Sequence, residues 1–278
     1  MPKEEPIISE PALNAVKVNV DQTTSSKSGA ARLVEVTLRR FKSLFHIIVL
    51  LPLYMIASLC LGTAIAPGIA LVAYINELTI TSHYVLRFWS LGVSVAAAYF
   101  IYGLSLVLVV PFFNFILRTS LKEWRGQYYS LEVIPWYIHN GLTCLVRYTF
   151  LELMTPTPFN LIFYRLMGMK IGYGTIINSS HISDPSMIEL GKKVTIGGSA
   201  TVVAHYAQGG YLIISKVKIG DRATIGLKCT IMGGVEIGEH AKILSNSFVL
   251  PKTKIPAGEI WGGVPAVKIE QDMQPPLA

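Results

Sequence analysis

The stretch IGDRATIGLKCTIMGGVEIGEHAKILSNSFVLPKTKI, residues 219–255, decides the fold. An aliphatic residue returns at every sixth position throughout it, and glycine often follows directly. The same spacing continues upstream at Leu190, Ile196 and Val202. Small residues often fill the fifth place of a hexad: Thr175, Ala200, Ala223, Cys229, Ala241 and Ser247. A run of this regularity indicates a repeat architecture with one structural unit per few residues.

The hexad pattern is the signature of a left-handed parallel β-helix. Each hexad predicts one short strand and a turn, and three hexads close a triangular coil of about 18 residues. The aliphatic side chain points inward, and the glycine takes a turn conformation that a Cβ would oppose. Stacked coils bury one continuous column of Ile and Val. We therefore predict an all-β left-handed parallel β-helix over residues 169–269.

The chain before the repeat is unusually apolar. Hydrophobic residues make up 51% of the 278 residues and charged residues only 15%, where about one quarter is usual. Residues 45–75 and 89–117 contain no Asp, Glu, Lys or Arg, and a straight membrane span needs about 20 residues. We predict an α-helical membrane hairpin of two transmembrane helices within residues 31–118. Its first helix should run from about 44 to 64, followed by a broken or tilted continuation, because Ala66-Pro67-Gly68 interrupts the run.

Basic residues flank this hairpin on both sides: Arg32, Arg39, Arg40 and Lys42 before it, and Arg118, Lys122 and Arg125 after it. The loop between the helices carries only Glu77 and Arg87 as full charges. By the positive-inside rule, both flanks face the cytoplasm. We expect an integral protein of the bacterial inner-membrane type, with both termini and the β-helix domain cytoplasmic. The three cysteines form no metal-type pair, which fits reduced thiols in that compartment.

The remaining segments are a disordered tail over 1–30, an interfacial helical linker over 119–168 and a short tail over 270–278. The linker contains an apolar stretch, 133–153, which nevertheless carries His139, Asn140, Arg147 and Glu152. We favour a helix at the membrane surface or against the domain. A third span stays open, and it would put the repeat domain outside the cytoplasm.

The repeat resembles the hexapeptide-repeat acyltransferases over about residues 165–269, including the closing phrase IPAGEIWGGVPAVKI, 255–269. It is most similar to the membrane-bound C-terminal modules of non-ribosomal-peptide-synthetase-like enzymes of the polylysine synthetase type. There, too, membrane helices precede a stretch like LIFYRLMGMKIGYGT, and a histidine interrupts the coils. The resemblance implies a homotrimer that binds an acyl thioester, usually acyl-CoA, between neighbouring prisms.

The hexad spacing is interrupted in VVAHYAQGGYLIISKVKIG, residues 202–220. The resemblance implies that His205, at the start of this excursion, is a general base. The chemistry agrees, because a hydroxyl or amine that attacks a thioester must lose a proton and an imidazole accepts one near neutral pH. Asp184 and Glu189 precede His205 by about one coil, and a carboxylate would orient the imidazole. The residues do not choose between them, and a plain turn role for Asp184 is equally open.

Two further histidines lie in the repeat. His181, in the irregular first coil, is a second catalytic candidate, and His240 is expected to be a solvated turn residue. These two and His205 lack the close spacing that places two ligands on one metal, so we expect no metal ion. The candidates for donor binding are Gly226, Lys228, Trp261, Gly262 and Lys268. Here the lysines would pair with CoA phosphates, and Gly226 would let a pantetheine arm pass close to the backbone.

These features predict an integral-membrane acyltransferase. It would move an acyl group from acyl-CoA, acetyl-CoA first, or from a carrier thioester. The acceptor would be a hydroxyl or amine of a membrane-associated small molecule, glycan or lipid-linked compound. Two alternatives remain: an aminoacyl-transferring, peptide-forming module working with a carrier protein, and a non-catalytic β-helix membrane scaffold. The net charge of +7 could suggest nucleic acid, but no nucleic-acid-binding signature accompanies it.

Overall fold

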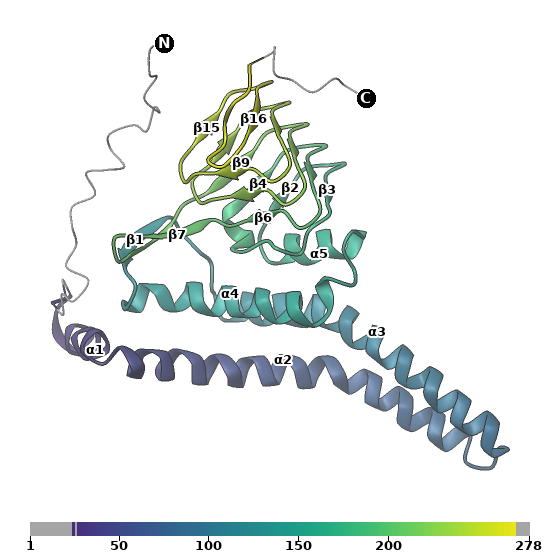
Figure 1. Cartoon of the computed structure of the whole chain (residues 1–278). Helices are drawn as coiled ribbons and strands as arrows, with labels where there is room; N and C mark the ends of the chain where they lie inside the picture. The colour runs from purple at the N-terminus through teal and green to yellow at the C-terminus, as the bar shows by residue number, and fades with distance from the viewer. Residues whose placement is uncertain (1–23, 26, 271–278) are drawn as a thin grey trace, which may run out of the picture.

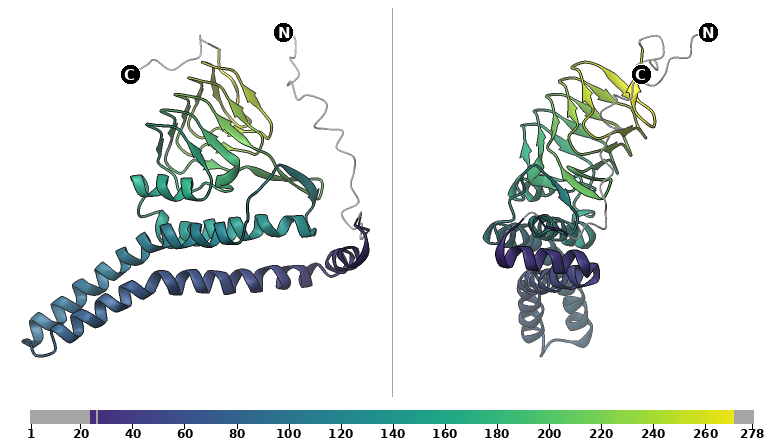
Figure 2. Two further views of the ribbon diagram at one scale, coloured as in Figure 1. Left: turned by 180° about the vertical axis from the view of Figure 1, so that it is seen from behind. Right: turned by 90° about the vertical axis from the view of Figure 1, so that its left-hand side faces the viewer.

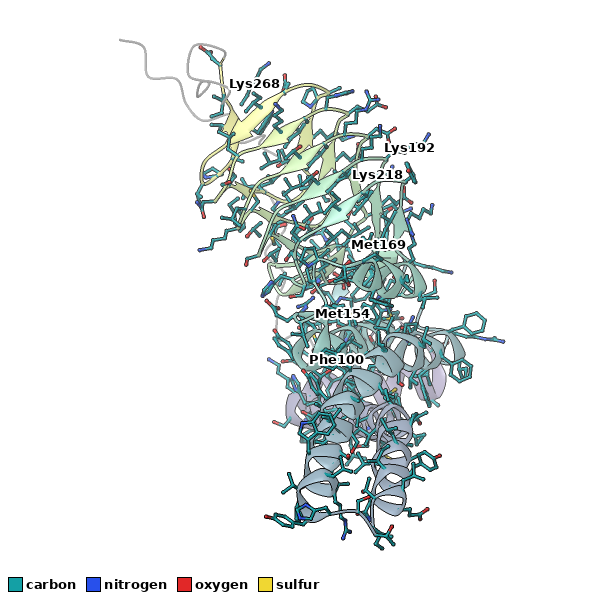
Figure 3. All side chains as sticks on the ribbon, turned by 90° about the vertical axis from the view of Figure 1, so that its right-hand side faces the viewer. Phe100, Met154, Met169, Lys192, Lys218 and Lys268 are labelled. Carbon is teal, nitrogen blue, oxygen red and sulfur yellow. The ribbon has the colours of Figure 1, made fainter. Side chains whose placement is uncertain are left out.

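A computed structural model describes residues 24, 25 and 27–270, which form a β-helix standing on a layer of helices (Figure 1). The tails predicted over 1–30 and 270–278 lie almost wholly outside the described residues. Helix α1 (Gly29–Arg40) starts inside the first of them. Figure 3 follows the layers from Phe100 of the hairpin, through Met154 and Met169, to Lys268 at the far end of the β-helix.

The hairpin consists of α2 (Lys42–Leu78) and α3 (Tyr84–Ile116), which lie side by side and bend together (Figure 2). Of the two continuations expected beyond residue 64, broken or tilted, the broken one is absent, because α2 continues through Pro67 as a single helix. A proline removes one backbone hydrogen bond, and a helix packed on a neighbour absorbs the loss as a kink. The helices are close at this level, since a Cβ added to Gly68 would lie 3.0 Å from the Cβ of Ala98.

Both hairpin helices are long and apolar enough to cross a membrane, over Phe45–Leu78 and Tyr84–Ile116. Only 22% and 28% of their most apolar windows are buried inside the protein. Large side chains such as Leu51, Leu108 and Phe115 are therefore exposed. An apolar surface of this size on a folded protein marks a contact with lipid or with another protein.

A second helical layer separates the hairpin from the β-helix (Figure 1). It contains a 3-10 turn η2 (Leu131–Val133), helix α4 (Ile134–Val146), a π-helical turn η3 (Arg147–Leu151) and helix α5 (Pro158–Leu166). Helix α4 packs on both α2 and α3. The packing is tight, because a Cβ on Gly141 would lie 2.7 Å from Leu53. Residues 133–153 thus pack against the domain as a helix.

The repeat forms a three-sided parallel β-helix whose strands stack into three sheets. One sheet contains β2 (Lys170–Ile171), β4 (Ile188–Leu190), β9 (Val217–Ile219), β12 (Glu236–Ile237) and β15 (Lys254–Ile255). The second contains β3 (Ile176–Ile177), β5 (Thr195–Ile196), β10 (Thr224–Ile225), β13 (Lys242–Ile243), β16 (Ile260–Gly262) and the antiparallel β17 (Val267–Lys268). The third contains β6 (Thr201–Val202), β11 (Thr230–Ile231) and β14 (Phe248–Val249). Equivalent aliphatic residues pair from coil to coil, as Ile196, Ile225 and Ile243 do.

The glycines that follow inward aliphatic residues have a different role from the one predicted. At Gly220, Gly226 and Gly238 the backbone has no positive φ. Instead, a Cβ at Gly226 would lie 2.5 Å from the backbone nitrogen of Ser245 in the next coil. The glycines are needed because successive coils approach closely at these corners. The left-handed conformation occurs three residues after the inward aliphatic residue, at Lys193, Ser199, Arg222, Lys228, His240, Asn246 and Lys252.

The interruption after Val202 is an ordered β-hairpin of β7 (His205–Gln208) and β8 (Tyr211–Ile214). Gly209 and Gly210, both at positive φ, form its turn, which agrees with glycine's tolerance for that conformation. Strand β8 also pairs antiparallel with β1 (Trp124–Gln127), the strand that follows the α2–α3 hairpin. The excursion is thus held by a three-stranded sheet, in the order β1-β8-β7.

Candidate active site

His205 meets Asp184 where the β-helix rests on the helical layer. The Nδ1 atom of His205 lies 2.6 Å from Oδ2 of Asp184. The carboxylate is fully buried, whereas the imidazole side chain is 26% exposed. A carboxylate oxygen can only accept a hydrogen bond, so Nδ1 carries the proton and Nε2 is left as the basic nitrogen. The pair therefore combines a fixed carboxylate with a partly accessible base.

The Asp184 carboxylate accepts hydrogen bonds from three directions. Besides His205, the backbone N–H of Ala204 donates to Oδ2 at 3.1 Å, and the indole Nε1–H of Trp136 donates to Oδ1 at 2.9 Å. The Trp136 ring also stands edge-on to the His205 imidazole, with 4.9 Å between ring centroids. A buried carboxylate is costly unless it is hydrogen-bonded in this way. The turn role left open for Asp184 is present too, because its φ is 57°.

Helix α4 and turn η3 hold the backbone around Asp184 as well. The side-chain oxygen of Asn140 accepts from the N–H of Asp184 at 3.3 Å. The buried guanidinium of Arg147 donates to the carbonyl of Ile182 and to the hydroxyl of Ser183. Arg147 opens the π-helical turn, and such turns re-aim side chains within a helix. Side chains of one continuous helical segment, α4 and η3, thus form hydrogen bonds with residues 182–184.

His139 lies on α4 one helical turn after Trp136, and its side chain is fully buried. Its Nδ1 lies 2.9 Å from the side-chain oxygen of Asn114, and its Nε2 lies 3.4 Å from the hydroxyl of Ser186. Burial lowers the pKa of His139 to about 4, although the Asp184 charge opposes the shift. His139 is therefore neutral at physiological pH and serves as a polar link between hairpin, α4 and β-helix.

The other two histidines of the repeat and the alternative carboxylate, Glu189, do not contact His205. Glu189 contacts Lys170 at 2.9 Å and Lys216 at 3.1 Å on the outer face, and those contacts lower the pKa of its carboxyl group. His240 is exposed at a left-handed turn position. His181 lies in the first coil, and its buried Nδ1 has no hydrogen-bond partner among the described residues. Asp184 is thus the carboxylate that the fold brings to His205.

The predicted donor residues form a separate group. Trp261 and Lys268 face each other across β16 and β17, and both side chains contact Glu259, at 2.8 and 2.5 Å. Gly226 follows β10 and Gly262 ends β16 in the same sheet, so both lie at one corner of the prism. His205 follows β6, at the next corner along the coil. Within one chain the structure does not bring the donor residues together with His205.

Sequence reasoning missed two features of the site. Gly233 lies directly against the backbone before His205, where a Cβ would come within 2.9 Å of the Ala204 carbonyl carbon. The doubled glycine Gly233-Gly234, directly after Met232, was a visible signal for it. The other is Trp136, whose role had no signal beyond a tryptophan in an apolar stretch. The polar residues of 133–153 were visible, but they did not distinguish a helix at the membrane surface from one packed against the domain.

No model of a known protein family matches this chain. Among curated proteins it is 21% identical over 211 residues to the Delta-poly-L-ornithine synthetase of Acinetobacter baumannii, covering 74% of this chain and 16% of that protein. It is 32% identical over 100 residues to the mitochondrial Gamma carbonic anhydrase 2 of Arabidopsis thaliana, covering 35% of this chain and 34% of that protein. It is 29% identical over 155 residues to a Bacillus subtilis protein named "Putative acetyltransferase YvoF", covering 50% of this chain and 87% of that protein.

Among solved structures, a maltose O-acetyltransferase from Clostridium difficile is similar, with a TM-score of 0.41 and 18% identity, covering 55% of this chain and 94% of that one. The predicted resemblance to hexapeptide-repeat acyltransferases is confirmed by relatives of that kind, and so is the likeness to a peptide-polymer synthetase. The chain spans only 16% and 34% of the first two relatives' lengths.

The likeness to a carbonic anhydrase raises the question of a metal ion. Within residues 24, 25 and 27–270, no group of three or more His, Cys, Asp or Glu side chains is arranged to hold one. The imidazole of His205 is engaged by a carboxylate through Nδ1. That pairing is the arrangement expected of a general base oriented by an acid partner.

Proposed function

We propose that this protein transfers an acyl group from a thioester to a hydroxyl or amine, with His205 as general base. The observation that carries the proposal is the 2.6 Å contact between His205 and the buried Asp184. With Nδ1–H held by the carboxylate, Nε2 takes the proton of the acceptor as its oxygen or nitrogen attacks the thioester carbonyl. The carbon–sulfur bond then breaks, and the proton passes from His205 to the leaving thiolate.

The proposed donor is acyl-CoA, with acetyl-CoA the first to test. Trp261, Gly262 and Lys268, together with Gly226 and Lys228, would bind it. Because these residues lie at a different corner of the prism from His205, the proposed active unit is a homotrimer. In it, the donor corner of one chain would meet the histidine of its neighbour.

We place the hairpin in the membrane and the acceptor at its surface. Two features support this: the exposed apolar surfaces of α2 and α3, and the basic residues on both flanks. His205 also lies at the end of the β-helix next to the helical layer, in contact with Trp136 of α4. That location suits a glycan, lipid-linked compound or other acceptor held at the bilayer, on the cytoplasmic side.

A second candidate is transfer of an aminoacyl group from a carrier-protein thioester to an amine, which forms a peptide bond. The similarity to Delta-poly-L-ornithine synthetase favours it, since it extends over 74% of this chain, well beyond the repeat. The same base would take a proton from the amine of the acceptor as its nitrogen attacks the thioester carbonyl. Transfer only from carrier-bound thioesters, and none from CoA thioesters, would identify this candidate.

The deciding experiment measures thiol release by the purified full-length protein in lipid nanodiscs. Acetyl-CoA is supplied with hydroxyl and amine acceptors, soluble and lipid-linked, and wild type is compared with His205→Ala. The variant should lose roughly 100- to 10,000-fold of the acceptor-dependent rate, while His240→Ala, at an exposed turn, keeps it. Equal rates in wild type and His205→Ala would remove His205 from the mechanism.

The trimer can be tested by complementation. His205→Ala and Trp261→Ala each disable one half of a shared site, so each alone should be inactive. If the site lies between chains, mixed trimers contain some sites with an intact histidine and an intact donor corner, and co-expression should restore part of the activity. No recovery in verified mixed oligomers would place both halves in one chain.

A further inference from the structure

We propose that Trp136 is a positioning residue for the catalytic pair, acting through Asp184 from the helical layer. The proposal rests on the function assigned above to His205 and Asp184. Trp136 is in α4, outside the repeat, and 48 residues separate it from Asp184 along the chain. The β-helix therefore supplies the acid and the base, and the helical layer supplies the group that fixes the acid.

The contacts of Trp136 go to both members of the pair. Its Nε1–H donates to Oδ1 of Asp184 at 2.9 Å, while the opposite oxygen, Oδ2, binds His205. Its ring meets the imidazole edge-on at 4.9 Å. The side chain is only 7% exposed. A buried hydrogen bond to a charged acceptor is among the stronger ones in proteins, so this contact fixes the rotation of the carboxylate.

The hydrogen bond also sets how much negative charge Asp184 presents to His205. A donor on Oδ1 neutralises part of the carboxylate charge, and its removal leaves more charge facing the imidazole. Other titratable or charged groups close to Asp184 are His139 and Cys144 on α4 and Arg147 on η3. None of these is altered by a change at Trp136, so a changed titration of His205 reports on the Trp136 contact.

A test independent of any acceptor is chemical modification of His205 by diethyl pyrocarbonate, which reacts with the neutral imidazole. The rate is followed against pH in the full-length protein by mass spectrometry of the His205 peptide. Trp136→Phe keeps the ring contact and removes the N–H. We expect the pH midpoint of modification to rise by about 0.5 unit, because the less neutralised carboxylate favours the protonated ring. The acyl-transfer rate should fall about 10-fold, with little change in KM.

Two controls make the result specific. The exposed His240 reports general reactivity within each sample, and Trp124→Phe removes an indole from β1 that packs against the same apolar core. Trp136→His restores an N–H donor on a smaller ring and should return the His205 midpoint towards that of wild type. It also serves if Trp136→Phe does not fold.

The outcomes separate this proposal from the proposed function. A midpoint that is unchanged in Trp136→Phe, or that moves equally in Trp124→Phe, overturns the positioning role. A fall would mean that the carboxylate has rotated away from His205, which also requires Trp136 to hold it. Acyl transfer that is absent even in wild type, with a shifted midpoint in Trp136→Phe, would reject the proposed function and keep the positioning of Asp184.

Discussion

The β-helix and the helical layer beneath it meet at Asp184, and they are built by opposite rules. In the β-helix every coil repeats the same solution: an inward aliphatic residue, a small neighbour and a glycine where the coils approach. In the helical layer, single side chains such as Trp136, His139 and Arg147 make hydrogen bonds that differ from one residue to the next. The repeated coils thus form the scaffold, and the individual contacts at the end next to the helical layer form the candidate site.

The largest effect is expected from a substitution of Asp184, the residue where the two regions meet. Asp184→Asn keeps the size of the side chain and removes its charge. The amide can donate to Nδ1, which favours the wrong tautomer of His205. Acyl transfer should fall roughly 100- to 10,000-fold, measured as acceptor-dependent thiol release. A variant that folds and retains wild-type activity would contradict the assigned role of Asp184.

The helical layer should also give the protein its acid sensitivity. The pKa of His139 in the folded protein is about 4, whereas an unfolded imidazole titrates near 6.5. Between these values the unfolded chain binds the proton and the folded one does not. Stability contributed by neutral His139 is therefore complete above about pH 6.5 and is lost as the pH falls towards 4, by roughly 3 kcal/mol in total.

Replacing His139 with Asn removes this titration. Thermal unfolding between pH 6.5 and pH 4 should then depend less on pH than in wild type, even if the variant is less stable throughout. His240→Asn, at an exposed turn of the β-helix, should leave the pH dependence unchanged. An equal slope in wild type and His139→Asn would show that the acid sensitivity has another source.

Within the β-helix, the expected weak points are the coil corners. A Cβ at Gly238 would lie 2.4 Å from the backbone nitrogen of Ala257, and backbone cannot move aside. Gly238→Ala should cost about 1–3 kcal/mol of unfolding free energy, measured by denaturant titration. At Gly198 the nearest atom is the end of the Leu227 side chain, at 3.1 Å. Gly198→Ala should therefore cost much less, and equal costs would contradict the close-approach role.

The smallest effect is expected at the carboxylate that the fold leaves outside the site. Glu189→Gln breaks contacts with Lys170 and Lys216 on the outer face. Exposed ion pairs contribute about 1 kcal/mol or less, so stability and acyl transfer should both stay near wild type. A large loss of activity would mean that Glu189 serves the reaction in spite of its distance from the pair.

These expectations reflect how unevenly the sequence determines the structure. The coils could be predicted residue by residue, because each hexad interacts with its neighbours in the same way and Ile225 or Ile243 needs no distant partner to be placed. The glycines were recognised and misinterpreted, since the sequence shows where a Cβ is absent but not whether φ or a neighbouring coil excludes it. At Pro67 the sequence left a broken and a tilted continuation open, because packing against α3 is invisible along one helix.

The site was predictable only in part. His205 was visible because it begins the interruption of a regular pattern. The choice of Asp184 over Glu189 depends on which way residues 182–184 turn, and that is decided by Asn140 and Arg147 about 35 to 45 residues earlier. Trp136 could not be assigned, because a single tryptophan in an apolar stretch has the same pattern whether it faces lipid, core or carboxylate.

The pairing of β1 with β8 has a consequence for the order in which this protein assembles. Trp124 leaves the ribosome long before its partner Ile214, so β1 waits unpaired while the first coils are made. Contacts between such distant residues form late. The excursion that begins at His205 therefore closes only after the hairpin, the helical layer and the lower coils are already in place. The coils that follow the excursion in the sequence then stack on a site whose surrounding elements are already folded. Assembly thus proceeds outward from the proposed membrane anchor.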